Sequence, residues 1–164
     1  MFRIKAEHSE QIEVKTSIER AREFFDNLRN IAELMPGIES ITNEAGGAKR
    51  WMVRADIPML GVMRAAFAVE QTTSSPERIE WSPAATEQKN YLRLVATFQE
   101  RGAQTLVRVK QHVEMRRQHA RELHMLAGLV GESRISCEMQ KYVADMMKTF
   151  LARARAKLES LETK

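Results

Sequence analysis

The end of the chain carries the pattern that most restricts its fold. After Gly131, no glycine or proline interrupts a run of apolar residues at helical spacing, and charged residues occupy the positions between them. Spacing of three and four residues is typical of a helix with one apolar face. We therefore predict a single amphipathic helix of about 25–30 residues. Its apolar face consists of Ile135, Met139, Val143, Met146, Met147, Phe150, Ala154, Leu158 and Leu161.

Most of the chain before this helix alternates apolar and polar residues, which predicts strands with one buried face. Turns rich in glycine, proline and serine separate these segments, so we expect consecutive antiparallel hairpins. In the first strand, His8–Gln11 interrupts the alternation, and this break fits a β-bulge or an exposed edge. The predicted strands cover residues 2–6 and 12–14, 38–41, 51–57, 63–69, 79–81, 92–98 and 107–115.

Two short helices are predicted between the first two strands. Thr16-Ser17 can cap the first helix, and an apolar stripe runs from Ile18 to Met35 with a break near residues 27–30. Pro36-Gly37 then ends the stripe, because proline lacks an N–H group and its ring clashes with the preceding turn. Further along, the apolar segment 121–131 is short and fits either a helical turn or a lid loop.

These elements predict an α+β fold. A sheet with one dry face must be covered, and one long helix is available for this. We expect a curved antiparallel sheet of about six to seven strands wrapped around the C-terminal helix. The inward positions mix large aromatic residues with several alanines, which is compatible with an internal cavity. We find no linker or repeat, so residues 1–164 are expected to form one domain.

Several classes of protein are excluded by composition. No apolar run approaches the roughly 20 residues of a membrane helix, and the first residues show no secretory h-region, so we expect a cytoplasmic protein. The single cysteine, Cys137, cannot form an internal disulfide or a CxxC zinc site, and we interpret it as a buried structural residue. His112, His119 and His124 lack the spacing of zinc ligands. We expect no metal and no cofactor.

Several segments, taken in order, resemble a known family. They are Phe25 and Leu28, then LMPGI (residues 34–38), Gly46-Gly47, GVMRAAF (residues 61–67) and LAG (residues 126–128), followed by the terminal helix. The chain resembles the START-like (SRPBCC, helix-grip) superfamily, with its closest likeness to the CoxG-like family, the G-subunit family of carbon monoxide dehydrogenase. The resemblance implies a helix-grip fold with a hydrophobic cavity that holds lipids, quinones, sterols or polyketides.

The inward positions of the predicted strands and helix are the candidate ligand-binding residues. Gln71 and Gln111 share the apolar parity and are the candidate polar points of the pocket, where each could orient one polar group of a ligand. The alternative is an ordinary core, in which the methionine side chains fill the space. The candidates are Trp51, Val53, Phe67, Val69, Gln71, Trp81, Leu94, Phe98, Val109, Gln111, Val113, Met139, Val143, Met146, Met147 and Phe150.

Positive charge is concentrated late in the chain. The formal net charge is +4, and Arg116, Arg117 and Arg121 precede an apolar stretch. These three arginines are candidate contacts for a peripheral membrane surface or a protein partner, and the alternative is a solvated face. Nucleic acid is an unexpected partner, because Tyr142 is the one nearby aromatic residue that could stack on a base. The oligomeric state is left open.

Three functions follow from these observations. The first is a carrier that is not an enzyme and holds an apolar lipid or quinone for delivery to a membrane or an enzyme. The second is an enzyme of the polyketide cyclase or aromatase kind, which needs a polar catalytic group in the cavity. Asp56 and Glu70 lie on the outward parity, and we identify no such group. The third is an interaction module with a collapsed cavity.

Overall fold

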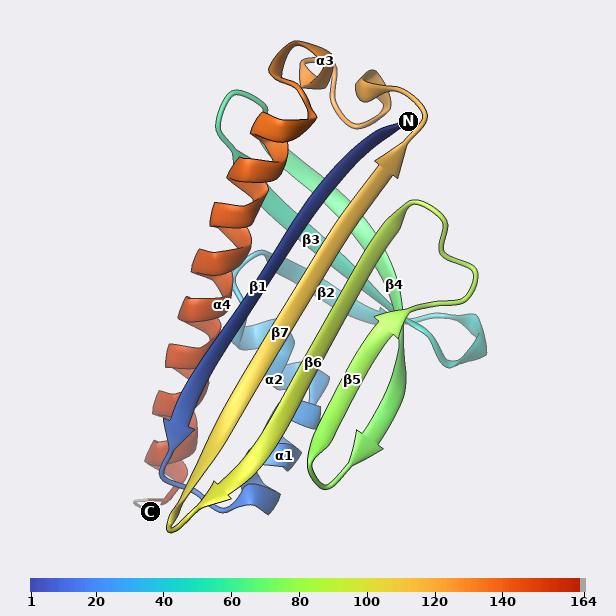
Figure 1. Cartoon of the computed structure of the whole chain (residues 1–164). Coiled ribbons are helices and arrows are strands. Elements are labelled where there is room, and N and C mark those ends of the chain that lie inside the picture. The colour runs from blue at the N-terminus through green and yellow to red at the C-terminus, as the bar shows by residue number, and fades with distance from the viewer. Residues whose placement is uncertain (163–164) are drawn as a thin grey trace.

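The computed structural model describes residues 1–162 and shows a seven-stranded antiparallel sheet in the order β1-β7-β6-β5-β4-β3-β2. The long helix α4 lies along β1, while α1 and α2 lie behind the sheet in the view of Figure 1. The strands are β1 (Phe2–Val14), β2 (Ile38–Asn43), β3 (Lys49–Ile57), β4 (Gly61–Ser75), β5 (Arg78–Pro83), β6 (Asn90–Arg101) and β7 (Gln104–Arg117). The helices are α1 (Ile18–Asp26), α2 (Leu28–Leu34), α3 (Ala127–Val130) and α4 (Glu132–Glu162).

Two sequence ambiguities are settled by this arrangement. β1 pairs with β7 from Phe2 to Val14 without a register shift, so His8–Gln11 forms no bulge and belongs to an edge strand. The alternation breaks there because two polar residues take the inward positions, with His8 Nε2 3.0 Å from Glu10 Oε2. The segment 121–131 is helical in part and not a plain loop, since it contains part of a 3-10 turn (Ala120–Glu122) and the four-residue α3.

Side chains of α4 cover the open edge of β1. The backbone N–H of Arg3 donates to Glu132, that of Lys5 to Ser136 Oγ (3.2 Å), and that of Glu7 to Gln140 Oε1 (2.8 Å). The acceptors on α4 are four residues apart, a rise of about 6 Å, and the donors on β1 are two residues apart, about 6.7 Å. The two spacings therefore match over these three pairs. The helix therefore satisfies donors that would otherwise offer a template for pairing with another chain.

Gln140→Leu tests this edge contact. Gln140 accepts from the Glu7 N–H and also donates to the Glu7 carbonyl oxygen. Loss of both bonds is expected to lower the free energy of unfolding by about 1–2 kcal/mol. Hydrogen exchange at the Glu7 amide should also become faster, while Lys148→Leu on the exposed face of α4 should leave it unchanged. Unchanged exchange at Glu7 in the Gln140 variant would refute the contact.

The turn between α2 and β2 explains the Pro-Gly pair. Gly37 has a φ of +87°, a left-handed conformation that other residues rarely adopt. A Cβ atom at this position would lie 2.3 Å from the hydroxyl of Tyr142 and 2.8 Å from the carbonyl oxygen of Arg54. The Gly37 carbonyl in turn accepts from the Arg54 N–H at 2.7 Å. Glycine is therefore required where β2 begins, because the chain passes close to both β3 and α4.

The interior has two parts along the length of α4. At one end, three aromatic rings from α1, β6 and α4 pack together, with ring centroids 5.9 Å apart for Phe25–Phe98 and 5.8 Å apart for Phe25–Phe150. Such aromatic contacts add to the stabilisation from area burial. Towards the other end, methionine and alanine residues face α4 and leave a small internal space. The functional candidate lies in this second part.

Candidate functional site

A cavity of about 30 Å³ lies between the concave face of the sheet and α4. It is almost entirely apolar, and four of its lining residues are methionines. Water needs roughly 10–15 Å³, whereas pockets for drug-sized ligands measure about 300–1,000 Å³. As it stands, the space therefore suits one or two water molecules. The lining residues are Val53, Ala55, Met63, Ala65, Phe67, Leu92, Gln111, Val113, Met115, Met139, Tyr142, Val143 and Met146.

The cavity has a buried floor and a partly exposed mouth. On the floor, Gln111 and Val143 are 1% exposed. At the mouth, between β3, β4 and α4, Met63, Ala65 and Tyr142 are half-buried. The Tyr142 hydroxyl donates to the Arg54 carbonyl oxygen at 2.7 Å. Burial raises the pKa of Tyr142, and the charge of Asp56 raises it further, so the hydroxyl keeps its proton at neutral pH.

Four buried side-chain polar atoms have no hydrogen-bond partner among residues 1–162. They are Gln111 Oε1, Asn90 Oδ1, Trp51 Nε1 and Trp81 Nε1. Gln111 lines the cavity itself, opposite Leu94 on β6, and Leu94 pairs in turn with Trp81 on β5. An unpaired buried polar group costs about 1–3 kcal/mol. The Gln111 oxygen can accept a hydrogen bond from a donor inside an otherwise apolar space.

Comparison with known proteins relates this architecture to a protein family. The family model for CoxG, described as the G subunit of carbon monoxide dehydrogenase, matches residues 11–155. The chain belongs to the CoxG family. A search of curated proteins gave no match.

Solved structures similar to this CoxG-family chain share its fold at low identity. A Deinococcus radiodurans protein has a TM-score of 0.61 at 16% identity, covering 94% of this chain and 98% of that one. A START superfamily protein from Mycobacterium smegmatis has a TM-score of 0.57 at 15% identity, with coverages of 94% and 98%. The Zhui aromatase/cyclase from Streptomyces sp. R1128 has a TM-score of 0.59 at 13% identity, with coverages of 92% and 93%.

The predicted α+β helix-grip fold is confirmed, with its curved antiparallel sheet, C-terminal helix and two short helices after the first strand. Proteins of this fold family commonly bind hydrophobic molecules.

The structure divides the predicted ligand-binding residues of the CoxG-family chain into three groups. Seven line the cavity: Val53, Phe67, Gln111, Val113, Met139, Val143 and Met146. Eight are buried in the core outside its lining: Trp51, Val69, Trp81, Leu94, Phe98, Val109, Met147 and Phe150. Gln71 is exposed, so its predicted place inside a pocket is corrected: its amide donates to Asp26 on α1 at 2.6 Å. A register shift between Gln71 and Thr73 carries this end of β4 past the core.

Six lining residues are absent from the predicted set: Ala55, Met63, Ala65, Leu92, Met115 and Tyr142. Five of them have the same inward parity as the predicted residues, so the alternation alone could have included them. Tyr142 is expected from the sequence only as an aromatic residue that could stack on a base, which implies an exposed position. Its helical position next to Val143 and Met146 is the signal that could have placed it at the edge of the apolar stripe.

The three candidate contact arginines have different surroundings. Arg116 lies 2.7 Å from Glu114 and stacks over the ring of Tyr91, 4.5 Å from its centroid. Arg117 is half-buried and donates to the carbonyl oxygen of Arg116. Arg121 is exposed beside Met125 and Leu129, which are 82% and 86% exposed. Of the three, Arg121 is the one that adjoins an exposed apolar surface.

Three further features of the described residues relate to the predictions about metal ligands, membrane helices and Cys137. Within residues 1–162, no three His, Cys, Asp or Glu side chains lie together in a way that could hold a metal ion. No helix in the same range is both long and apolar enough to cross a bilayer. Cys137 is exposed on α4, which corrects its interpretation as a buried residue.

Proposed function

We propose that this CoxG-family chain is a binding and carrier protein for an apolar small molecule of the lipid or quinone class. The molecule would occupy the cavity between the sheet and α4. The observation that carries the proposal is Gln111, whose side-chain oxygen is buried in an apolar cavity without a partner among residues 1–162. A ligand with one hydrogen-bond donor on an apolar body, such as a lipid with a hydroxyl group or a quinol (the reduced form of a quinone), would satisfy that oxygen and bury its own apolar surface. A quinone has only acceptor oxygens and would be held by its apolar surface.

Binding requires the cavity to expand from about 30 Å³. Met63, Met115, Met139 and Met146 line it, and methionine is unbranched, with three rotatable bonds and a polarizable sulfur. These side chains can change rotamer without a change in the backbone. Because the half-buried residues lie on the β3–β4 side, a ligand would enter there, past Tyr142.

Binding is better supported than catalysis. The lining contains no acidic side chain, histidine, lysine or arginine, and its one titratable group is Tyr142. The hydroxyl proton of Tyr142 is already engaged by the Arg54 carbonyl oxygen. General acid–base catalysis needs a group within hydrogen-bond reach of the substrate and with a suitable pKa. The likeness to an aromatase/cyclase therefore concerns the fold alone.

Delivery would use the end of the molecule at which the β3–β4 hairpin, α3 and the start of α4 lie (Figure 1). Met59 and Val62 in the hairpin and Met125 and Leu129 near α3 are exposed there. Exposed apolar side chains beside a cation, here Arg121, are suited to a peripheral membrane surface or a protein partner. Such contact would bring the acceptor close to the start of the ligand's path.

Ligand titration of the wild type and of Gln111→Leu tests the proposal. We expect saturable quenching of the fluorescence of Trp51 and Trp81 by a short-chain quinol or quinone, or displacement of a fluorescent fatty acid. Gln111→Leu removes an unpartnered polar group, so the unliganded stability should stay equal or rise by about 1 kcal/mol. Its affinity for a ligand with a hydroxyl group should fall by about five- to tenfold.

Gln99→Leu on the outer face of β6 is the matched control and should change neither stability nor affinity, because Gln99 is exposed. If the wild type binds none of these molecules, the interior is a core filled by methionine and the interaction-module hypothesis is favoured. If Gln111→Leu is clearly destabilised without ligand, the Gln111 oxygen has an internal partner and is not the recognition point.

A further inference from the structure

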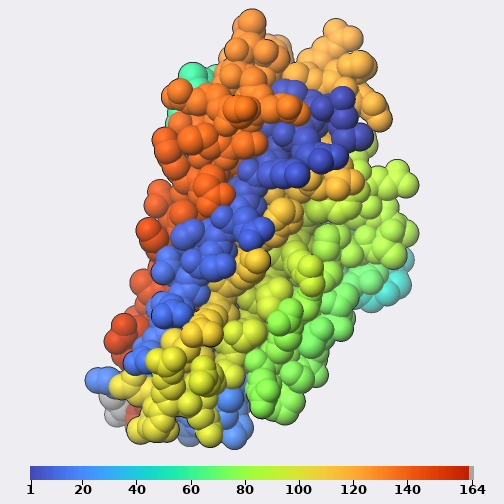
Figure 2. Space-filling view, in the orientation of Figure 1, coloured from blue at the N-terminus to red at the C-terminus, as the bar shows by residue number. Residues whose placement is uncertain are grey.

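The outer face of the sheet carries a second hollow that the proposed carrier function does not use. It is a groove of about 820 Å³ across β1, β7, β6 and β5, on the side facing the viewer in Figure 2. Small residues, Ser9, Val95 and Thr97, form its floor, and long charged side chains stand around them. An adjoining hollow of about 330 Å³ shares Arg78, Thr97 and Arg108 with the groove.

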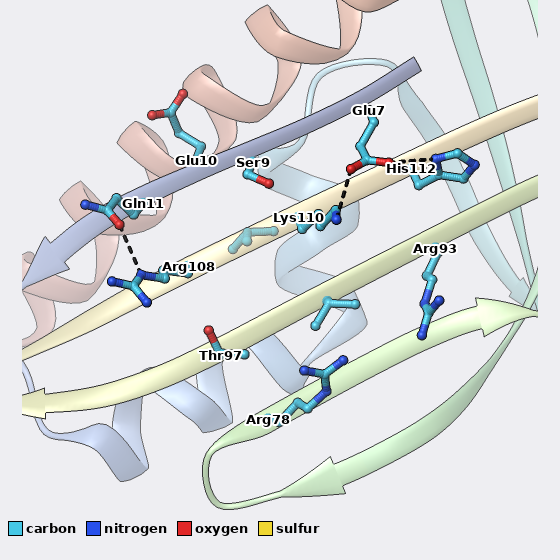
Figure 3. A pocket seen from close by; sticks show the side chains of 12 residues that line it. Glu7, Ser9, Glu10, Gln11, Arg78, Arg93, Thr97, Arg108, Lys110 and His112 are labelled. Carbon is cyan, nitrogen blue, oxygen red and sulfur yellow. Dashed lines mark hydrogen bonds and ion pairs between the residues drawn. The ribbon is translucent and has the colours of Figure 1, made fainter. Parts of the chain in front are cut away.

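The strand register places these three shared residues in one row. Arg78 on β5 pairs with Thr97 on β6, and Thr97 pairs with Arg108 on β7. The side chain of Thr97 therefore lies between two guanidinium groups, as Figure 3 shows. No hydrogen bond from the Thr97 hydroxyl to another described residue is present, so this hydroxyl and the outer N–H groups of both arginines are available to a ligand.

A buried carboxylate holds part of this row in place. Glu80 is 6% exposed. Arg78 Nη2 donates a hydrogen bond to one Glu80 oxygen at 3.0 Å, and Arg93 Nε donates to the other oxygen at 2.6 Å. Burial by itself raises the pKa of Glu80, but hydrogen bonds from Arg93 and Arg78 outweigh this and hold the pKa below its ordinary value. Glu80 therefore stays ionised and holds the side chains of Arg78 and Arg93 in place. The bonds to Glu80 come from Nε and Nη2 of each arginine, so the Nη1 groups are left for other partners.

Positive charge exceeds negative charge in this part of the groove. Arg78 and Arg93 share the single carboxylate of Glu80, and Arg108 has only the neutral Gln11 side chain as a partner among residues 1–162, at 3.1 Å. Glu77, which lines the adjoining hollow, adds a second negative charge, so three positive charges against two leave +1 around the row. Glu10 on β1 also lines the groove and lies 3.0 Å from His8. Lys110, further along, is compensated by Glu7 at 2.9 Å, and the ring of His112 lies 3.2 Å from the same carboxylate. A phosphate monoester carries about −1.5 to −2 at neutral pH, and it would accept charge-assisted hydrogen bonds from the free guanidinium N–H groups of the row.

We propose that Arg78, Thr97 and Arg108 form a binding site for the phosphoryl group of an anionic ligand. Two guanidinium groups and a hydroxyl approach from three directions, which suits a tetrahedral group with three terminal oxygens. A carboxylate has two oxygens, and a single guanidinium fork already satisfies both. The rest of the ligand would extend along the groove over Val95 and Ser9. The site lies on the face opposite the internal cavity, so it stands independently of the carrier function.

Calorimetric titration of the full chain with inorganic phosphate and pyrophosphate tests the site, with sodium acetate at equal ionic strength as the reference anion. We expect saturable binding of phosphate or pyrophosphate at millimolar concentrations or below and no saturation with acetate. Arg108→Gln should weaken binding by about tenfold and Thr97→Val by about threefold. Arg64→Gln is the matched control, because it removes the same charge from a β4 residue outside the groove, and it should leave the affinity unchanged.

A second arm distinguishes the sources of the phosphoryl group. Vesicles of phosphatidylcholine with phosphatidic acid are compared with pure phosphatidylcholine vesicles in a flotation assay. Vesicle binding that Arg108→Gln reduces assigns the site to a lipid headgroup, and phosphate binding without vesicle binding assigns it to a free phosphorylated molecule. The proposal is overturned if phosphate does not saturate, if acetate competes equally, or if Arg64→Gln weakens binding as much as Arg108→Gln.

Discussion

Replacing Gly37 with alanine is expected to lower the free energy of unfolding by about 3 kcal/mol or more. Two effects add together. The φ of +87° disfavours any residue with a Cβ atom, and that atom would lie 2.3 Å from the Tyr142 hydroxyl and 2.8 Å from the Arg54 carbonyl oxygen. The hydroxyl can move, but the carbonyl belongs to the backbone of β3. Urea denaturation followed by circular dichroism measures the change.

Gly46→Ala provides the matched control for this prediction. Gly46 also has a positive φ, of +77°, but a Cβ atom there would meet no atom within 4 Å. Its substitution should therefore cost only the conformational strain, about 1 kcal/mol. The difference between the two variants isolates the steric contact at Gly37. Equal destabilisation of the two variants would show that the close approach of β2 to Tyr142 and Arg54 is absent in solution.

Ala65→Phe is expected to close the mouth of the cavity and to weaken binding of apolar ligands by at least about tenfold. Ala65 is half-buried on β4 and lines the cavity on the side where a ligand would enter. A phenyl ring can occupy this partly open position without removing any core side chain. The stability of the folded protein should therefore change little. Titration with a fluorescent fatty acid and with a quinone measures the effect.

The neighbouring residue Ala66 supplies the control for this blocking variant. It is also half-buried on β4 but has the outward parity, opposite to Ala65. Ala66→Phe adds the same side chain to the same strand on the other face, and its ligand affinity should match that of the wild type. Retained affinity in Ala65→Phe, or equal loss in both variants, would place the ligand elsewhere or assign the loss to distortion of β4.

Most of the fold could be predicted from the sequence because each element has a periodic signal of its own. The alternation at Trp51–Ile57 and Leu92–Phe98 identifies strands and their inward faces, and the stripe after Gly131 identifies α4. No such signal indicates whether an inward residue lies beside the cavity or elsewhere along its strand. Trp81 and Leu94 face inward as expected, yet they pack in the core outside the cavity lining, because parity states the face of a residue and not its depth along the sheet.

The features that the sequence did not reveal depend on contacts between distant segments. Glu80 belongs to a solvated face by its parity, but Arg78 and Arg93 cover it. The row of Arg78, Thr97 and Arg108 exists only through the pairing of three strands. The lack of a hydrogen-bond partner for the Gln111 side-chain oxygen likewise depends on the residues that surround it. A polar residue on an apolar parity is the one sequence signal that points to this atom.

Native mass spectrometry of the purified full chain, followed by extraction of any retained molecule, tests the carrier proposal most directly. We predict that the chain retains one apolar molecule per protein, or takes one up from a panel of lipids and quinones. We also predict that Ala65→Phe retains less than Ala66→Phe. A wild-type chain that shows only its own mass before and after exposure to the panel would contradict the carrier proposal, because the cavity of about 30 Å³ would then be the whole of the interior space.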